Sequence, residues 1–172
     1  SLIPMVWSKA FKRELYVRYQ MLVDNCIAMG EDGVITYSCI ANADSMCMFD
    51  ERNYFYRDNQ NSLTRSKKKY ISLEGALCRI RMLEKTLPRD NQLVQEQLAA
   101  YVAHALFNVT RSHFKSNKIG EVKKEIQPVV GRKDIKAYLK VACTAENRKE
   151  RLAAKALYRQ HFLLIKIFSM ID

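Results

Sequence analysis

Residues that form turns are scarce in this sequence, which contains only 5 Gly and 3 Pro among 172 residues. A many-stranded β-sandwich or barrel needs frequent turn residues, so the scarcity favours long helices instead. Hydrophobic residues make up 48% of the chain, a share that excludes a disordered tail. The length is enough for one domain of ordinary size with its own buried core.

Long apolar runs are also missing, since none reaches the roughly 18–20 residues that a membrane-spanning helix needs. The first residues carry no basic stretch of the kind that opens a signal peptide. The 3 histidines are scattered without metal-ligand spacing, so this chain alone is expected to hold no metal. These absences predict a cytoplasmic protein.

No Cys-x-x-Cys pair occurs among the 5 cysteines, and their number is odd. Four of them stand among apolar neighbours in the sequence: Cys26, Cys39, Cys47 and Cys78. Such cysteines are typical of small buried hydrophobic side chains in a reducing compartment. The sequence therefore predicts neither a disulfide framework nor a zinc site.

Charge is strongly unbalanced toward the positive side. The chain has 29 Lys and Arg against 18 Asp and Glu, a formal net charge of +11. An excess of this size suits anionic partners such as nucleic acid, phosphorylated sugars, lipid phosphates or an acidic membrane face. Net charge does not choose among these partners, and a protein that is simply basic is the structural alternative.

The first part of the chain predicts mixed structure. Ser8 is expected to cap a helix over residues 9–15, and a second helix is expected over residues 31–43, directly after Gly30. Residues 44–57 predict two short strands or extended segments. A polar loop is expected to follow, up to residue 69.

From residue 70 onward the pattern is helical. One apolar stripe ends at Pro88, and Asp90 or Asn91 is expected to cap the next helix. A short helix is expected to stop before Pro128, another to include residues 135–142, and a single last helix to cover 145–171. The predicted fold is mainly α with a small β element, divided into a mixed region, 1–69, and a helical bundle, 70–172.

Adjacent carboxylates stand at the start of the helix that follows Gly30. Glu31 and Asp32 can hold a general base beside an acceptor hydroxyl, because Asp and Glu abstract protons within hydrogen-bond reach. The positive end of a helix dipole also attracts acidic residues for purely structural reasons. The pair is therefore a candidate catalytic site with a structural alternative.

Two further segments carry candidate binding residues. Arg57 and Arg65, with Ser62 between them, bracket a polar loop whose guanidinium donors suit a phosphate or pyrophosphate. Trp7 and Lys9 belong to a segment that places an aromatic anchor among basic residues. A solvated loop is the structural alternative for the first segment, and core packing for the second.

Taken in this order, the segments resemble the second half of inverting family 2 glycosyltransferases of the GT-A type, especially enzymes that build bacterial surface polysaccharides. In that family a Val-Trp-x-Lys-x-aromatic-Lys/Arg-Arg segment precedes an acidic Glu-Asp helix, and a Tyr-x-Tyr-Arg segment leads into Ser-x-Thr-Arg. The matching segments here are Val6–Arg13, Gly30–Asp32, Tyr54–Arg57 and Ser62–Arg65. The resemblance covers residues 4–66, and the helical remainder agrees only in general character.

The resemblance implies a hexosyl-type transferase that moves a sugar from a nucleotide-sugar to a glycan or lipid-linked acceptor in surface polysaccharide biosynthesis. Asp32 would be the general base that takes the proton of the acceptor hydroxyl. Glu31 would orient Asp32 or hydrogen-bond the acceptor.

The same resemblance assigns the binding residues of both substrates. Arg57, Ser62 and Arg65 would lie near the donor phosphates or an anionic acceptor, where they balance charge as the nucleoside diphosphate leaves. Trp7 and Lys9 would shape the floor beneath the site.

One half of the family's architecture is missing from the sequence. The family's first half is a nucleotide-binding α/β layer in which an Asp-x-Asp motif holds a divalent metal, Mn or Mg, against the donor pyrophosphate. No Asp-x-Asp precedes Glu31, and about 30 residues are too few for such a layer, since one βαβ unit needs about as many. We therefore expect a fragment that is inactive alone and holds no cofactor. Apolar surface at residues 2–7 and 34–40 would then favour a homodimer.

The basic residues of the helical part suit an acidic membrane surface, where a lipid-linked acceptor would sit. This predicts peripheral contact with the inner face of the cell membrane, and packing on the catalytic domain is the alternative. The main alternative function is a basic helical binding module for nucleic acid or an acidic partner. Nucleic acid is the less favoured ligand because neither helix-turn-helix spacing nor an RNA-binding signature occurs.

Overall fold

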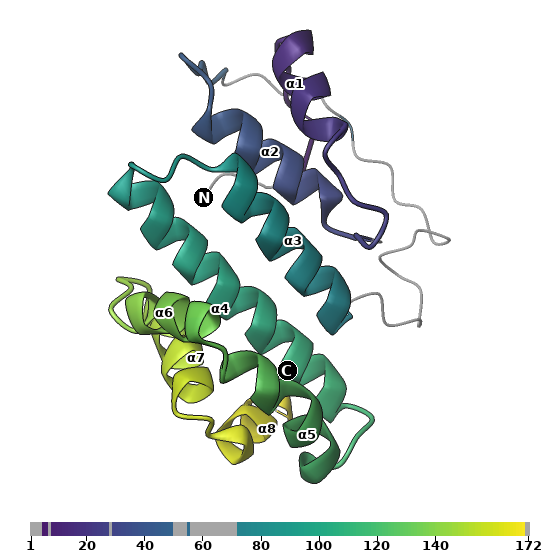
Figure 1. Cartoon of the computed structure of the whole chain (residues 1–172), viewed down its shortest axis with the longest axis vertical. Coiled ribbons are helices and arrows are strands. Elements are labelled where there is room, and N and C mark those ends of the chain that lie inside the picture. The colour runs from purple at the N-terminus through teal and green to yellow at the C-terminus, as the bar shows by residue number, and fades with distance from the viewer. Residues whose placement is uncertain (1–4, 7, 28, 50–54, 56–71, 171–172) are drawn as a thin grey trace. The chain divides into compact units, whose positions relative to one another are not determined.

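The computed structural model describes residues 5–6, 8–27, 29–49, 55 and 72–170. The chain forms two compact units, a first unit of residues 1–88 and a second unit of residues 89–172. Both are helical, and the described residues contain no strand (Figure 1). The prediction of a mainly α fold is confirmed. The compact units divide after Pro88, later than the division predicted after residue 69.

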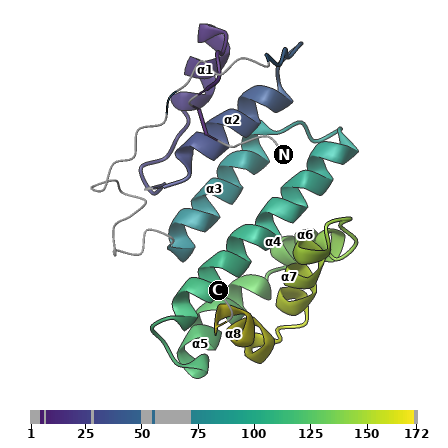
Figure 2. The ribbon, with the colours of Figure 1, turned by 180° about the vertical axis from the view of Figure 1, so that it is seen from behind.

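The described residues of the first unit form three helices, α1 (Arg13–Gln20), α2 (Glu31–Ala41) and α3 (Leu73–Thr86). Helix α2 contacts both α1 and α3, and it lies between them in both ribbon views (Figures 1 and 2). Tyr19, Ile35 and Cys39 form a buried cluster between α1 and α2. Partly buried side chains of α1 and of the segments just before and after it pack against this cluster: Val6, Phe11, Leu15, Tyr16 and Val23.

A buried polar network joins α2 to the end of α3. The hydroxyl of Thr86 donates to the carbonyl of Met82 at 3.0 Å, so its lone pairs remain free to accept from the Ser38 hydroxyl at 2.7 Å. The side-chain amide of Asn42 donates to the carbonyls of Ser38 and Thr86. Because buried hydroxyls need partners, these bonds specify the register between the two helices.

A disulfide joins Cys26, in the loop before α2, to Cys78 in α3, across a sequence separation of 52 residues. The prediction that these two cysteines are reduced core side chains is therefore wrong. It failed because the two residues approach only when α3 packs beside α2, with Cα atoms 6.4 Å apart. Cys39 is free and buried, as predicted, whereas free Cys47 is exposed.

The predicted start of the first helix is also wrong. Helix α1 begins at Arg13 after Lys12, which provides no side-chain cap. Ser8 has a φ angle of 59°, whereas an N-cap residue adopts an extended backbone with negative φ. The helix predicted directly after Gly30 is confirmed, since α2 begins at Glu31. Residues 44–49 form no strand, and most of the remaining β prediction lies outside the described residues.

The second unit is a bundle built around α4 (Gln92–Phe114), the longest helix at 23 residues. It contacts four other helices, which are α5 (Ile119–Val130), α6 (Lys133–Ala142), α7 (Arg148–Tyr158) and α8 (Phe162–Met170). Helix α4 begins at the predicted cap, where the Asn91 side chain accepts from the amide of Val94. The core is aliphatic and fully buried: Val102, Leu106, Val109, Val122, Ile126, Ile135, Leu139, Leu157 and Ile165.

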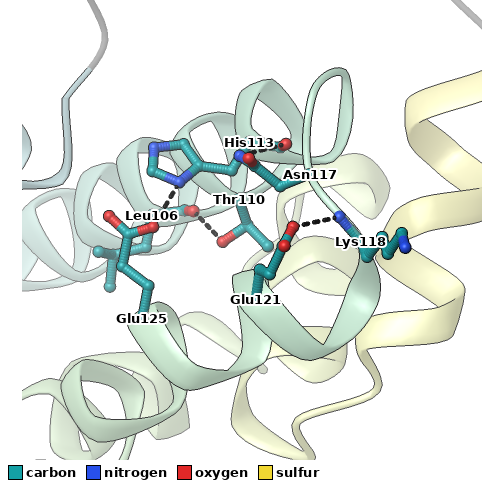
Figure 3. Close-up of polar contacts among 7 residues, drawn as sticks. All are labelled: Leu106, Thr110, His113, Asn117, Lys118, Glu121 and Glu125. Carbon is teal, nitrogen blue, oxygen red and sulfur yellow. Dashed lines mark hydrogen bonds and ion pairs between the residues drawn. The ribbon is translucent and has the colours of Figure 1, made fainter.

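Polar contacts close the turn between α4 and α5 (Figure 3). His113 on α4 lies 2.8 Å from the carboxylate of Glu125 on α5. Glu121 accepts from the backbone amide of Lys118 at 2.8 Å, which satisfies a free amide at the start of α5. The side chain of Asn117 donates to the carbonyl of His113 at the end of α4. The contact of His113 with Glu125 joins the two helices, and the other two contacts satisfy backbone groups at the helix ends.

Two helix boundaries in this unit differ from the predictions. Helix α5 continues through Pro128 to Val130. The proline removes one backbone donor from the helix, and because it is exposed, water can bond the carbonyl that loses this partner. The predicted last helix is two helices, α7 and α8. At the break, Gln160 adopts a φ of 56°, its amide donates to Leu157, and the amide of His161 donates to Ala156. This is a Schellman cap formed without the usual glycine.

Candidate functional site

The two acidic candidates occupy the first turn of α2, and both are partly exposed. The turn begins at Gly30, whose φ of 87° is a conformation that side-chain-bearing residues rarely adopt. The guanidinium of Arg79 donates to the carbonyl of Met29 at 2.6 Å, and a Cβ at Gly30 would lie 3.0 Å from the Arg79 side chain. Arg79 is only 8% exposed. A buried arginine of α3 thus supports the backbone that presents Glu31 and Asp32.

Burial raises the pKa of Asp32 above its ordinary value, and the neighbouring Glu31 carboxylate raises it further. A hydrogen bond with the backbone of Val6 opposes this shift of the pKa. A carboxylate with a raised pKa accepts a proton more readily than an ordinary one, as a general base requires. Part of its surface remains open, so an acceptor hydroxyl can reach it.

Glu31→Gln is expected to lower the pKa of Asp32 toward its ordinary value, because it removes the adjacent negative charge while keeping the side-chain shape. Carbon-13 NMR titration of the Asp32 carboxyl group measures this directly. The raised pKa also has a consequence for stability. The contribution of this raised pKa to the free energy of unfolding is fully present below the unfolded-state pKa of about 3.9. That contribution is lost as the pH rises through the folded-state pKa of Asp32. Glu14→Gln, a replacement of an exposed glutamate in α1, is the control and is expected to leave the Asp32 titration unchanged. An Asp32 pKa unchanged by Glu31→Gln would contradict the coupling.

A hollow of about 380 Å³ lies on the surface of the first unit. It is lined by Val6, Lys9, Phe11, Arg13 and Tyr16. The rings of Phe11 and Tyr16 lie 5.7 Å apart at 34°. Aromatic faces beside two cationic side chains suit a ligand with apolar ring faces and hydroxyl or anionic groups.

Val6 connects the hollow to the acidic pair. Val6 is one of the residues that line the hollow, and the backbone of Val6 forms the hydrogen bond with Asp32. The ammonium of Lys9 donates to the carbonyl of Met5 at 2.7 Å, which fixes the backbone next to Val6. The predicted association of Lys9 with the site of Asp32 is thus compatible with the geometry, while its role stays a prediction.

The other predicted site residues cannot be placed in this way. Trp7, Arg57, Ser62 and Arg65 lie outside the described residues. The convergence of Asp32 with Arg57 and Arg65 therefore stays a prediction.

Several residues around the site were not predicted from the sequence. Arg13 stood in the matched segment Val6–Arg13 but received no role, and Tyr16 follows it by one helical turn of α1. Arg13 could have been found within that segment, and Tyr16 by extending the segment along the helix. Arg79 is different, because nothing in its local sequence indicates that its guanidinium reaches Met29, 50 positions away.

No group of three or more His, Cys, Asp or Glu side chains that could hold a metal occurs in the described part of the chain. A search of the same residues also finds no helix long and apolar enough to cross a lipid bilayer.

Comparison with known proteins identifies a similarity to a glycosyltransferase. A segment of 59 residues is 41% identical to an uncharacterized glycosyltransferase, EpsJ, of Bacillus subtilis (strain 168). The segment is 34% of this chain and 17% of that protein, so the chain matches a small part of its relative. No family model matches the chain, and no solved structure matches it either. The similarity supports a relationship to glycosyltransferases.

Proposed function

We propose that the first unit is the acceptor side of a glycosyltransferase active site, of the inverting family 2 and GT-A type. The observation that carries the proposal is Asp32, a partly exposed carboxylate with a raised pKa that is hydrogen-bonded to the rim of an aromatic and cationic hollow. The similarity of 59 residues to a glycosyltransferase supports the same reading.

In the proposed reaction Asp32 takes the proton from an acceptor hydroxyl as its oxygen attacks the anomeric carbon of the donor sugar. The new glycosidic bond forms as the bond from that carbon to the phosphate breaks, and the nucleoside diphosphate leaves with the bonding electrons. Burial holds the pKa of Asp32 high, the Glu31 carboxylate raises that pKa further, and Glu31 also orients Asp32 or the acceptor.

The remaining site residues have binding roles in the proposal. Arg57, Ser62 and Arg65 balance the charge of the donor phosphates or of an anionic acceptor, and Trp7 and Lys9 form the floor of the site. A divalent metal belongs with a donor-binding half, and no step given to these residues depends on it. The enzyme is a hexosyl-type transferase of surface polysaccharide biosynthesis, and its acceptor is a glycan or a lipid-linked precursor at the cytoplasmic face of the cell membrane.

The hollow provides a test that does not need a donor. Short oligosaccharides of hexose and N-acetylhexosamine are expected to bind the 172-residue chain and to shift the NMR amide signals of Lys9, Arg13 and Asp32. Tyr16→Leu keeps apolar volume for the packing on α1 but removes the aromatic face, so glycan affinity is expected to fall about fivefold. Binding isotherms from the same titrations measure the change.

Tyr158→Leu in the second unit is the matched control, because it removes a partly exposed tyrosine far along the chain from the hollow. It is expected to leave glycan binding unchanged. If the wild-type chain and Tyr16→Leu bind every oligosaccharide with equal affinity, the hollow is not part of the acceptor site. The same conclusion follows if the NMR shifts are confined to the second unit.

A further inference from the structure

Helix α8 carries apolar side chains on two opposite faces. Phe162 and Ile165 are buried in the second unit. On the outer face Leu163, Ile167 and Met170 follow one another at intervals of four and three positions, so they form one stripe along the helix. Leu164 flanks that stripe. The four side chains, called the α8 stripe below, are exposed by 64%, 47%, 76% and 40% for Leu163, Ile167, Met170 and Leu164, respectively.

Helices α5 and α8 contact each other and lie side by side in both ribbon views (Figures 1 and 2). A hollow of about 520 Å³ adjoins the α8 stripe on the side of α5. Its walls are Ile119 and Lys123 of α5 together with Gln160–Leu164. The side-chain amide of Gln127 on α5 donates to the side-chain oxygen of Gln160, just before α8, at 3.0 Å. An exposed lysine therefore stands beside the apolar stripe, on the same side of the unit.

The second unit is strongly basic as a whole. Residues 89–172 contain 16 Lys and Arg against 8 Asp and Glu, so the second unit carries a net charge of +8 out of the +11 of the whole chain. The helix itself contains Lys166 and no acidic residue. The apolar stripe, with Lys123 and Lys166 beside it, suits an occupant that is apolar and also carries negative charge.

We propose that α8 docks the second unit onto an anionic lipid bilayer. The α8 stripe enters the boundary between headgroups and acyl chains, where Leu, Ile and Met side chains leave water. Lys123 and Lys166 extend toward lipid phosphates, since the long stem of a lysine can lie along apolar surface while its ammonium reaches the headgroups. This docking does not depend on the transfer chemistry proposed for the first unit.

A bilayer fits this face better than a second copy of the chain does. Four side chains on a helix of 9 residues offer on the order of a few hundred Å² of apolar surface. A stable protein dimer buries roughly 1,200–2,000 Å² in total. Two copies of the unit would also bring together two net charges of +8, which repel.

The test is cosedimentation of the 172-residue chain with sucrose-loaded vesicles. Vesicles of phosphatidylcholine with roughly one third phosphatidylglycerol are expected to bind the chain, and pure phosphatidylcholine vesicles to bind it at least tenfold more weakly. Leu163→Gln with Ile167→Gln is expected to reduce binding to the anionic vesicles about tenfold or more, because two apolar side chains no longer enter the bilayer. Lys123→Gln is expected to reduce it about fivefold.

Leu93→Gln is the matched control, since Leu93 is 66% exposed on α4 and belongs to the same unit. It is expected to bind vesicles as the wild type does. Equal binding to neutral and anionic vesicles would overturn the proposal, as would an unchanged affinity in the double variant. A dimer seen by ultracentrifugation, which the double variant dissociates and which binds no vesicles, would overturn it in favour of a contact between copies of the chain. Duplex DNA binding that survives the double variant while vesicle binding is absent would also overturn it, in favour of a nucleic-acid module.

Discussion

Asp32→Asn is expected to lower the rate of sugar transfer by about 10²–10⁴-fold, the range that a positioned general base contributes. Asparagine keeps the size and one acceptor oxygen of the side chain, but it cannot take the proton of the acceptor hydroxyl. The measurement uses a polypeptide that joins this chain to a nucleotide-sugar-binding half. It follows nucleoside diphosphate release in the presence of acceptor glycan.

Donor binding separates a catalytic loss from a structural one. The dissociation constant of the nucleotide-sugar is expected to stay within about twofold, since Asp32 acts on the acceptor and not on the donor. Asp44→Asn is the matched control because Asp44 is exposed just after α2, outside any helix. Transfer by Asp32→Asn at the wild-type rate would end the assignment of Asp32 as the base, although the glycan site in the hollow could still be tested by its own titration.

Removal of the disulfide is expected to have the largest effect on stability. Cys26→Ser should lower the free energy of unfolding by about 4 kcal/mol, the loop-closure entropy for the 52-residue separation between Cys26 and Cys78. The unfolded chain gains conformational freedom when the cross-link is lost. Because Cys26 is only partly buried, its replacement by serine disturbs little packing in the folded chain. Urea denaturation monitored by circular dichroism measures the change.

A double variant of Cys26 and Cys78 and a variant of the free cysteine Cys47 are the controls for this test. Cys26→Ser and the double variant with Cys78→Ser are expected to lose nearly the same stability, because either change removes the same bond. Cys47→Ser, at an exposed free cysteine, should change the free energy of unfolding by less than about 0.5 kcal/mol. A wild-type chain whose stability is unchanged by dithiothreitol, or whose 5 thiols all alkylate in denaturant without reduction, would contradict the cross-link.

The disulfide also bears on the candidate site. Cys26 precedes the Gly30 turn, and its partner Cys78 is adjacent in α3 to Arg79, which holds the carbonyl of Met29. Both contacts therefore anchor the loop that leads into Glu31 and Asp32 to one turn of α3. The amide signals of Glu31 and Asp32 are expected to report the loss of this anchor in the cysteine variants.

Local features of the sequence predicted much of the helical framework. The helical class followed from the scarcity of Gly and Pro, and Pro88 and Asn91 marked the end of α3 and the start of α4. The start of α2 after Gly30 was equally visible, together with its acidic first turn. These features involve only residues within one helical turn of each other, so the chain expresses them without reference to its fold.

What the tertiary structure decided involves residues that meet only after packing. A disulfide joins Cys26, in the loop before α2, to Cys78 of α3, and Arg79 supports the turn before Asp32. The α8 stripe forms only once Gln160 ends α7 in a left-handed conformation. Helix periodicity and capping depend on neighbours a few positions apart. A cross-link, a buried guanidinium or an exposed helix face depends on which distant surfaces exclude water together, and that is settled by packing of the whole unit.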